Sequence, residues 1–81
     1  MQIPKNKNEL IDLIKQRIKE NKFGNKNICF PDLSNIDVSF VTSMSQLFKH
    51  ALYKLKKPIK LDLSSWNMTN VEQINWMFAD C

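Results

Sequence analysis

The sequence has very little glycine, histidine and cysteine, and these scarcities exclude most kinds of active site. The single glycine, Gly24, rules out a glycine-rich loop that cradles phosphate. The single histidine, His50, has no cysteine or carboxylate beside it, and Cys29 and Cys81 lack the spacing of metal ligands. No nucleophile–base pair and no paired carboxylates stand out. We therefore expect no enzyme, no metal and no cofactor, and we expect His50 to be an exposed helix residue.

Two cysteines are too few for a disulfide framework, and long apolar runs are missing too. We expect a buried free thiol at Cys29 and a terminal thiol at Cys81, with a Cys29–Cys81 disulfide as the alternative. No apolar run approaches the ~18 residues of a membrane span. The N-terminus, MQIPKNKNELID, has neither the apolar region nor the cleavage site of a signal peptide. Unless a leader has been removed, we expect a cytoplasmic protein.

What the chain does contain is an ordinary share of apolar and charged residues. Apolar residues make up 43% and charged residues 25%, which is typical of a folded soluble protein and not of a disordered one. A chain of 81 residues is enough for one small domain. The 12 Lys and Arg residues outnumber the 8 Asp and Glu residues, a mild excess that suits an acidic partner without requiring nucleic acid.

One stretch of the sequence is written twice. DLSNIDVSFVTSMSQLF at residues 32–48 returns as DLSSWNMTNVEQINWMF at residues 62–78, with a constant offset of 30 residues and no gap. Self-similarity at such a period indicates stacked structural repeats. Five residues recur unchanged: Asp32/Asp62, Leu33/Leu63, Ser34/Ser64, Val41/Val71 and Phe48/Phe78.

Local patterns predict the elements around this repeat. A helix over residues 7–22 has one apolar face, with Asn6 as its cap, Glu9 reaching back to the N–H of Asn6, and Gly24 as its end. Alternation predicts neighbouring parallel strands at residues 27–33 and 59–64, although Pro31 weakens the first. An i, i+3, i+4, i+7 series of apolar residues predicts a helix over residues 41–56, and its second copy over 71–78.

The repeated string is similar to that of a known family. The pattern D-L-S-x-W-[ND]-x-[ST]-x-V-x-x-[MI]-x-x-M-F-x-x-C resembles the repeat of the BspA-like leucine-rich-repeat proteins, also called the mycoplasma lipoprotein-type repeat. The lead-in IPKNKNELIDLIKQRI is similar to the start of such proteins. The resemblance implies a strand followed by a helix in each repeat, stacked in a right-handed coil. It also implies a bacterial surface protein or lipoprotein with binding and adhesion roles and no catalytic residues.

Taken together, these patterns predict an α/β fold. We expect a short leucine-rich-repeat-like solenoid in one domain, with two strand–helix repeats and an N-terminal capping helix. Residues 1–26 form the cap, residues 27–57 the first repeat, and residues 58–81 a second repeat, either complete or incomplete, whose open side invites self-association. Asp32, Asp62, Asp37 and Asn67 recur with the scaffold, so we expect them to serve turns and caps.

Candidate binding residues gather between the two copies. The segment at residues 49–60 holds five of the 12 basic residues and no acid, so it either meets an acidic protein surface or phosphates, or is a solvated helix end. Trp66 replaces Ile36 and is expected in the core, whereas Trp76 replaces Gln46 and either anchors an interface or packs at the core edge. The partner-binding candidates are Lys49, Tyr53, Lys54, Lys56, Lys57, Lys60 and Trp76.

These features favour a non-catalytic protein-binding module. Small size, basic charge and the missing leader suggest a small inhibitor, encoded by a bacterium or a phage, that docks on a defence-system nuclease in the manner of an anti-CRISPR protein. Direct nucleic-acid binding is a weaker expectation. The alternative is a fragment or short member of a bacterial surface adhesin family with no activity of its own.

Overall fold

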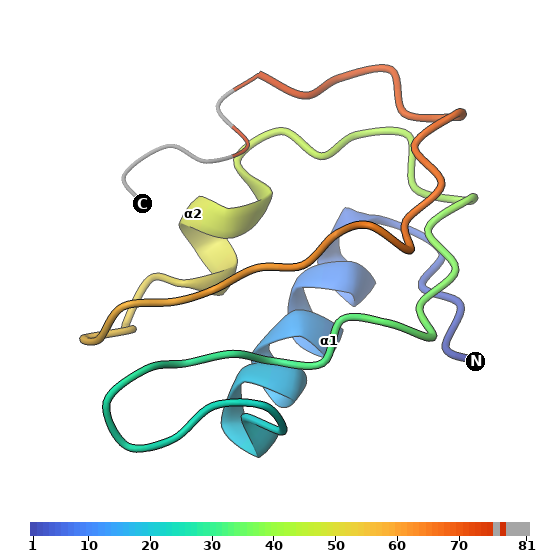
Figure 1. The fold of residues 1–81 in the computed structure, drawn as a ribbon. Coiled ribbons are helices and arrows are strands. Elements are labelled where there is room, and N and C mark those ends of the chain that lie inside the picture. Colours follow the sequence, from blue (N-terminus) through green and yellow to red (C-terminus); the bar gives the residue numbers. More distant parts are fainter. Residues whose placement is uncertain (76, 78–81) are drawn as a thin grey trace.

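The computed structural model describes residues 1–75 and 77, and in this part of the chain it has two helices, α1 (Lys7–Glu20) and α2 (Leu47–Ala51). The remaining described residues form turns and extended backbone. The first copy of the repeat and the second run side by side, each bending at a corner (Figure 1). Three isolated parallel bridges join neighbouring segments: Gln2 with Ile36, Cys29 with Ile59, and Ser43 with Gln73.

The predicted α/β solenoid of strand–helix repeats is wrong, because the described residues form no sheet. Where we expected parallel strands at 27–33 and 59–64, the two copies meet at one bridge. The Cys29 N–H donates to the Pro58 carbonyl at 2.9 Å, and the Lys60 N–H donates to the Cys29 carbonyl at 2.8 Å. The next donor that a parallel ladder needs is residue 31, which is proline and has no N–H. Pairing therefore stops after one bridge.

The predicted helix over residues 41–56 is reduced to the five residues of α2. The preceding residues pair with the second copy instead: the Glu72 N–H donates to the Thr42 carbonyl at 2.7 Å, and the Met44 N–H to the Gln73 carbonyl at 2.8 Å. Serine, threonine and valine in this stretch favour such non-helical backbone. For the predicted helix at 71–78, residues 71–75 are not helical, and residues 76 and 78 lie outside the described part.

Helix α1 confirms the predicted N-terminal helix and its cap. The Asn6 side chain accepts a hydrogen bond from the Glu9 N–H at 2.9 Å, although the Glu9 carboxylate accepts from the Lys5 N–H and not from that of Asn6. The helix ends with Asn21 in the left-handed conformation, which asparagine tolerates, so Gly24 is not its terminator. Gly24 is needed for space, because a Cβ there would collide with the Asn21 side chain.

A single core lies between α1 and the first copy. Leu10 and Ile14 of α1 are fully buried, and Ile11 nearly so. Burying each such side chain is worth about 1.5–3 kcal/mol, so this cluster holds most of the stability. The apolar series that suggested a helix is buried despite its different backbone. Its buried members are Val41, Met44, Leu47, Phe48 and Ala51.

Trp66 ties the second copy to this core, which confirms its predicted core position. Its side chain is only 6% exposed. The indole Nε1–H donates to the Leu33 carbonyl at 2.8 Å, and the ring stacks on Phe48 with 6.3 Å between centroids. The Asn70 side chain adds a hydrogen bond to the Ser39 carbonyl at 3.0 Å. Side chains of the second copy thus bind backbone groups of the first.

The recurring acidic residues serve turns, as predicted. Each accepts a hydrogen bond from the backbone N–H two residues further on, and Asn67 does the same for Thr69. These bonds and those of the serine side chains hold the pKa of each carboxyl below its usual value, with the serine side chain as the largest cause. The three pairs are Asp32 with Ser34, Asp37 with Ser39, and Asp62 with Ser64.

We expect Trp66→Phe to keep the stacking on Phe48 but to leave the buried Leu33 carbonyl without its donor. An unsatisfied buried acceptor costs about 1–3 kcal/mol in the free energy of unfolding. Urea unfolding followed by far-UV circular dichroism measures the loss. Phe40→Leu is the control, because Phe40 is 63% exposed and its change should stay within about 0.5 kcal/mol. Equal midpoints for both variants would mean that the indole bond contributes nothing.

We expect Asp37→Asn to make the fold less sensitive to acid. The lowered pKa of Asp37 means that its carboxylate stabilises the fold above the ordinary pKa of 3.8, and that this contribution is lost as the pH falls below that value. Asn67 shows that asparagine makes the same turn. The thermal midpoint of Asp37→Asn should therefore drop less than that of the wild type between about pH 6 and pH 2. Asp12→Asn, outside these turns, should retain the full drop.

Candidate binding surface

A hollow of about 370 Å³ lies between the C-terminal half of α1 and the segment that leaves α2. We call it the basic groove. Its lining combines apolar side chains with three lysines and one histidine, and no carboxylate lines it. The lining residues are Lys15, Ile18, Lys19, His50, Ala51, Tyr53, Lys54 and Leu55.

Both walls of the basic groove follow from local structure. Lys15, Ile18 and Lys19 have the i, i+3, i+4 spacing that places them on one face of α1. The other wall begins in α2 and continues through a turn closed by the Leu55 N–H, which donates to the Leu52 carbonyl at 3.0 Å. The two helices pack side by side, so these walls face each other (Figure 1).

The structure brings part of the predicted basic segment to the groove. Tyr53 and Lys54 line it, and Tyr53 is 79% exposed. Lys49 and Lys56 are exposed but do not line it. His50 is exposed on α2, as predicted, and it also lines the groove. The centre of the predicted segment is therefore at the surface and beside an apolar hollow.

Other predicted residues serve the fold or lie elsewhere. The Lys57 ammonium donates to the Asn25 carbonyl at 3.2 Å. The Lys60 ammonium lies 4.9 Å from the centre of the Phe30 ring, within the range of a cation–π interaction. Both lysines thus hold the start of the second copy against the loop of the first. Trp76 lies outside the described residues.

Sequence reasoning missed Lys15 and Lys19. Both lie outside the apolar face of the helix predicted at residues 7–22, and nothing in the sequence sets them against residues 50–55. The only available signal was that they flank Ile18, the last apolar position of α1, at the border of its apolar face. The fold brings these two basic segments together, so both walls of the groove carry lysines.

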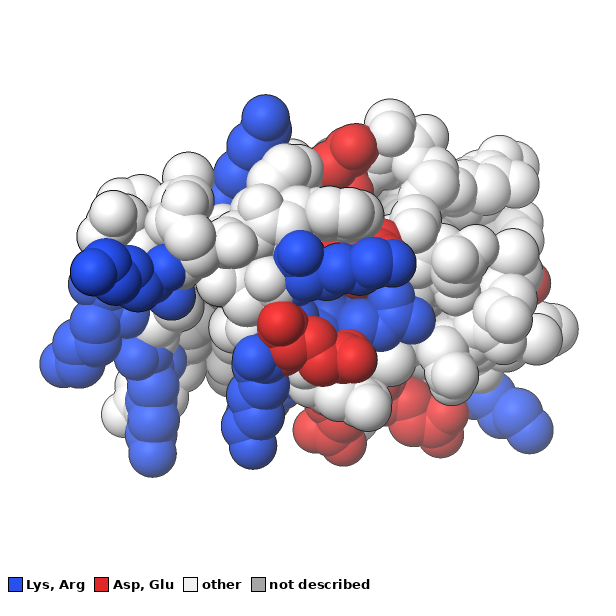
Figure 2. Space-filling view, turned by 60° about the horizontal axis from the view of Figure 1, so that its bottom comes forward, with Lys and Arg blue, Asp and Glu red and all other residues white. Residues whose placement is uncertain are grey.

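The charges of the surface are unevenly placed. On the face that Figure 2 shows, Lys and Arg side chains gather at one end without acidic neighbours, whereas the Asp and Glu side chains lie toward the middle and the other end. Along the chain, residues 49–60 hold five basic residues and no acid. A charged region of one sign attracts partners of the opposite sign over several ångströms.

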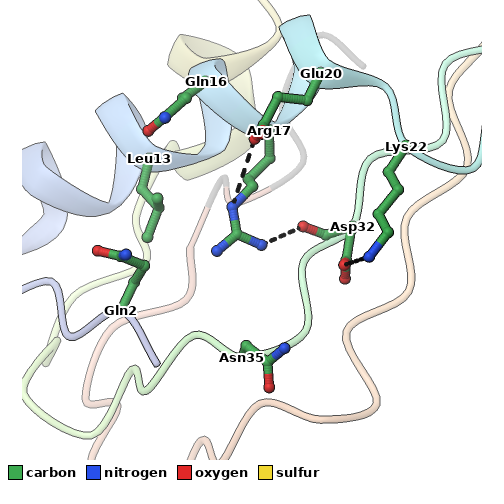
Figure 3. A pocket seen from close by; sticks show the side chains of 8 residues that line it. All are labelled: Gln2, Leu13, Gln16, Arg17, Glu20, Lys22, Asp32 and Asn35. Atoms are coloured by element: carbon green, nitrogen blue, oxygen red, sulfur yellow. Dashed lines mark hydrogen bonds and ion pairs between the residues drawn. The ribbon is translucent and has the colours of Figure 1, made fainter.

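A second hollow, of about 470 Å³, lies between α1 and the first copy (Figure 3). Arg17 reaches into it from α1, among the amide side chains of Gln2, Gln16 and Asn35. The hollow is polar, and two carboxylates, those of Glu20 and Asp32, share it with Arg17 and Lys22. Its formal charges therefore cancel.

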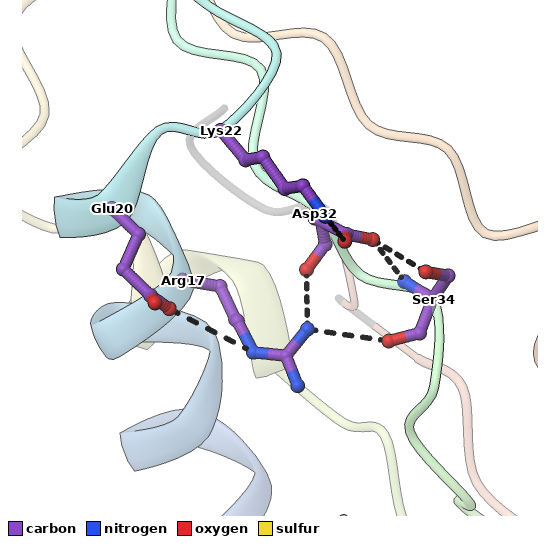
Figure 4. A network of polar contacts seen from close by, with 5 residues as sticks. All are labelled: Arg17, Glu20, Lys22, Asp32 and Ser34. Carbon is purple, nitrogen blue, oxygen red and sulfur yellow. Dashed lines mark hydrogen bonds and ion pairs between the residues drawn. The ribbon is translucent and has the colours of Figure 1, made fainter. Parts of the chain in front are cut away.

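The charged groups of this second hollow bind one another (Figure 4). Arg17 Nη1 donates to the carbonyls of Asp32 at 2.7 Å and Ser34 at 3.2 Å, and Arg17 Nε lies 3.9 Å from Glu20. The Lys22 ammonium lies 3.4 Å from the Asp32 carboxylate. These contacts fasten α1 to the backbone of the first copy, so we assign this cluster a structural role.

Among residues 1–75 and 77, the remaining reactive groups do not form a site. Cys29 is a free, buried thiol whose pKa is raised by burial, against a smaller lowering by Lys57, so it is a poor nucleophile. Cys81, its alternative partner, lies outside the described residues. Across residues 1–75 and 77, no three His, Cys, Asp or Glu residues are grouped to hold a metal ion. No helix in that part of the chain is long and apolar enough to cross a membrane.

Comparison with known proteins gives one match. No curated protein and no solved structure matches the chain. A family described as "Mycoplasma protein of unknown function, DUF285" matches residues 12–81, which include most of α1 and both copies of the repeat. Because this match spans far more than half of the sequence, the chain belongs to the DUF285 family of Mycoplasma proteins.

Proposed function

We propose that this protein is a non-catalytic protein-binding module and that the basic groove is its contact surface. One observation carries the proposal. An apolar hollow is open to solvent and has Lys15, Lys19 and Lys54 around it, with no carboxylate in its lining. Apolar centres surrounded by charged residues are typical of protein interfaces. Tyr53, at 79% exposure, supplies the kind of amphipathic side chain that often anchors them.

Charge favours an acidic protein surface as the partner. Nucleic-acid-handling enzymes bind their substrate in positively charged channels, and a basic surface repels such a channel. If the protein inhibits such an enzyme, it would therefore dock on an acidic face outside the channel. The proposal includes inhibition of a nuclease, which the size and charge of the chain suggest. It also includes a cytoplasmic location.

Kinship to the BspA-like repeat proteins belongs to the same proposal. It is supported by the pairing of Cys29 with Ile59 and of Ser43 with Gln73, since both pairs keep the 30-residue offset of the sequence repeat. The resemblance to that family implies binding without catalysis. A surface adhesin and an inhibitor would therefore use the same kind of contact surface. The identity of the partner would tell the two roles apart.

We expect Lys54→Glu to abolish capture of the partner without unfolding the protein. Lys54 lines the basic groove, and reversing its charge places a carboxylate opposite the acidic partner. The measurement is a quantitative pull-down from a lysate of the source organism with the wild type and the variant. Lys5→Glu is the matched control, because Lys5 is exposed and does not line the groove.

The expected result is a protein that wild type and Lys5→Glu retain in stoichiometric amounts and Lys54→Glu loses. Far-UV circular dichroism checks that both variants fold. Retention of every captured protein by Lys54→Glu would contradict the proposal that the basic groove is the contact surface.

A further inference from the structure

Resting on this proposed function, we propose that the basic groove receives one large apolar side chain from an acidic protein segment. The apolar side chain would enter the hollow, and carboxylates on either side of it would face the lysines of the two walls. The occupant is thus a protein segment that alternates acidic residues with an apolar anchor. The shape, the chemistry and the charge of the groove support this choice in turn.

The floor of the groove is aliphatic. Ile18 and Leu55 are half-buried and Ala51 is buried, and all three line the hollow, so its lining includes an aliphatic surface. A volume of about 370 Å³ exceeds that of cavities that hold benzene, roughly 150 Å³, so an aromatic or branched aliphatic side chain fits. Ala51 contributes only a methyl group, which leaves this space open.

The rim of the groove is positive on both walls. Lys15 and Lys19 stand on the α1 wall and Lys54 on the wall that follows α2, so a bound segment has ammonium groups on both sides. Asp12 lines an adjoining hollow that shares Lys15 and His50 with the groove. We therefore expect the acidic residues of the partner to lie beside Lys19 and Lys54 rather than beside Lys15.

Other occupants fit less well. Single-stranded nucleic acids stack their bases on aromatic side chains, and this groove has Tyr53 as its one aromatic residue above an aliphatic floor. A membrane surface needs a broad apolar face, whereas the apolar atoms here lie within a hollow below the lysine side chains. A second copy of this chain carries the same net charge of +4 and lacks an acidic segment to place opposite residues 49–60.

The test uses two synthetic peptides of about 12 residues that are rich in Glu and Asp and differ at one central position, Phe or Ala. Fluorescence anisotropy at physiological ionic strength measures their affinity for the full chain, since low salt would exaggerate purely ionic binding. We expect the Phe peptide to bind about tenfold more tightly than the Ala peptide, the difference that burial of such a side chain gives. Methyl resonances of Ile18 and Leu55 should shift with the Phe peptide.

Two variants with matched controls locate the binding. Tyr53→Ala should weaken the Phe peptide about fivefold or more and leave the Ala peptide unchanged, because Tyr53 covers only the apolar anchor. Lys19→Glu should weaken both peptides. Phe40→Ala, which removes another exposed aromatic side chain outside the groove, and Lys5→Glu should change neither affinity. Tyr53 and Lys19 are exposed, so both variants should fold, which circular dichroism confirms.

Equal affinities for the two peptides would overturn the inference, as would methyl shifts confined to other parts of the chain. Tighter, Tyr53-dependent binding of a single-stranded oligonucleotide, of vesicles containing anionic lipid, or of a second copy of the chain would assign the groove to that occupant instead. A lysate partner lost on Lys54→Glu but kept on Tyr53→Ala would leave the proposed function standing and refute the apolar anchor. Binding of the Phe peptide, without any lysate partner that depends on Lys54, would support the apolar anchor and refute the proposed function.

Discussion

The contact between Trp66 and the first copy of the repeat is the constraint on which much of this structure depends. One indole satisfies a buried carbonyl, that of Leu33, and covers the ring of Phe48 in α2. A five-residue helix has little stability of its own, so α2 persists because its side chains are packed from outside. Ala51, at the end of α2, is part of the floor of the basic groove. The position of the basic groove therefore depends on an aromatic residue of the second copy.

The sequence predicted which residues are buried better than it predicted their backbone. Two of the three bridges join residues that are 30 apart, the offset of the sequence repeat. Helix α1 was found because capping, amphipathicity and length agree in one segment. The series from Val41 to Ala51 was misread because helical spacing records only which side chains turn inward. Extended backbone with bends buries the same residues when it can pair with a second copy. Serine, threonine and valine at residues 41–43 favour such non-helical backbone. Pro31 acts elsewhere, where it ends the pairing after Cys29.

The candidate site was half predictable for a related reason. The sequence predicted Tyr53 and Lys54 because the basic segment that contains them is visible along the chain. Composition does not show which lysines of that segment make contacts that stabilise the fold. Lys57 and Lys60 have partners in the loop of the first copy, at Asn25 and Phe30. Lys15 and Lys19 reach the site only through the packing of α1 against α2, about 35 residues later in the sequence. Proximity of this kind requires the three-dimensional structure.

The rate at which the Cys29 thiol is alkylated would report how often the junction between the two copies opens. This thiol is buried at the bridge to Ile59, with a raised pKa, so an alkylating reagent meets it only when the junction opens. In a chain that carries serine in place of Cys81, the rate of labelling at one position would report how often the copies separate while α1 and its core stay folded. Cys29 is a poor nucleophile, but its burial makes the opening of the contact between the two copies directly measurable.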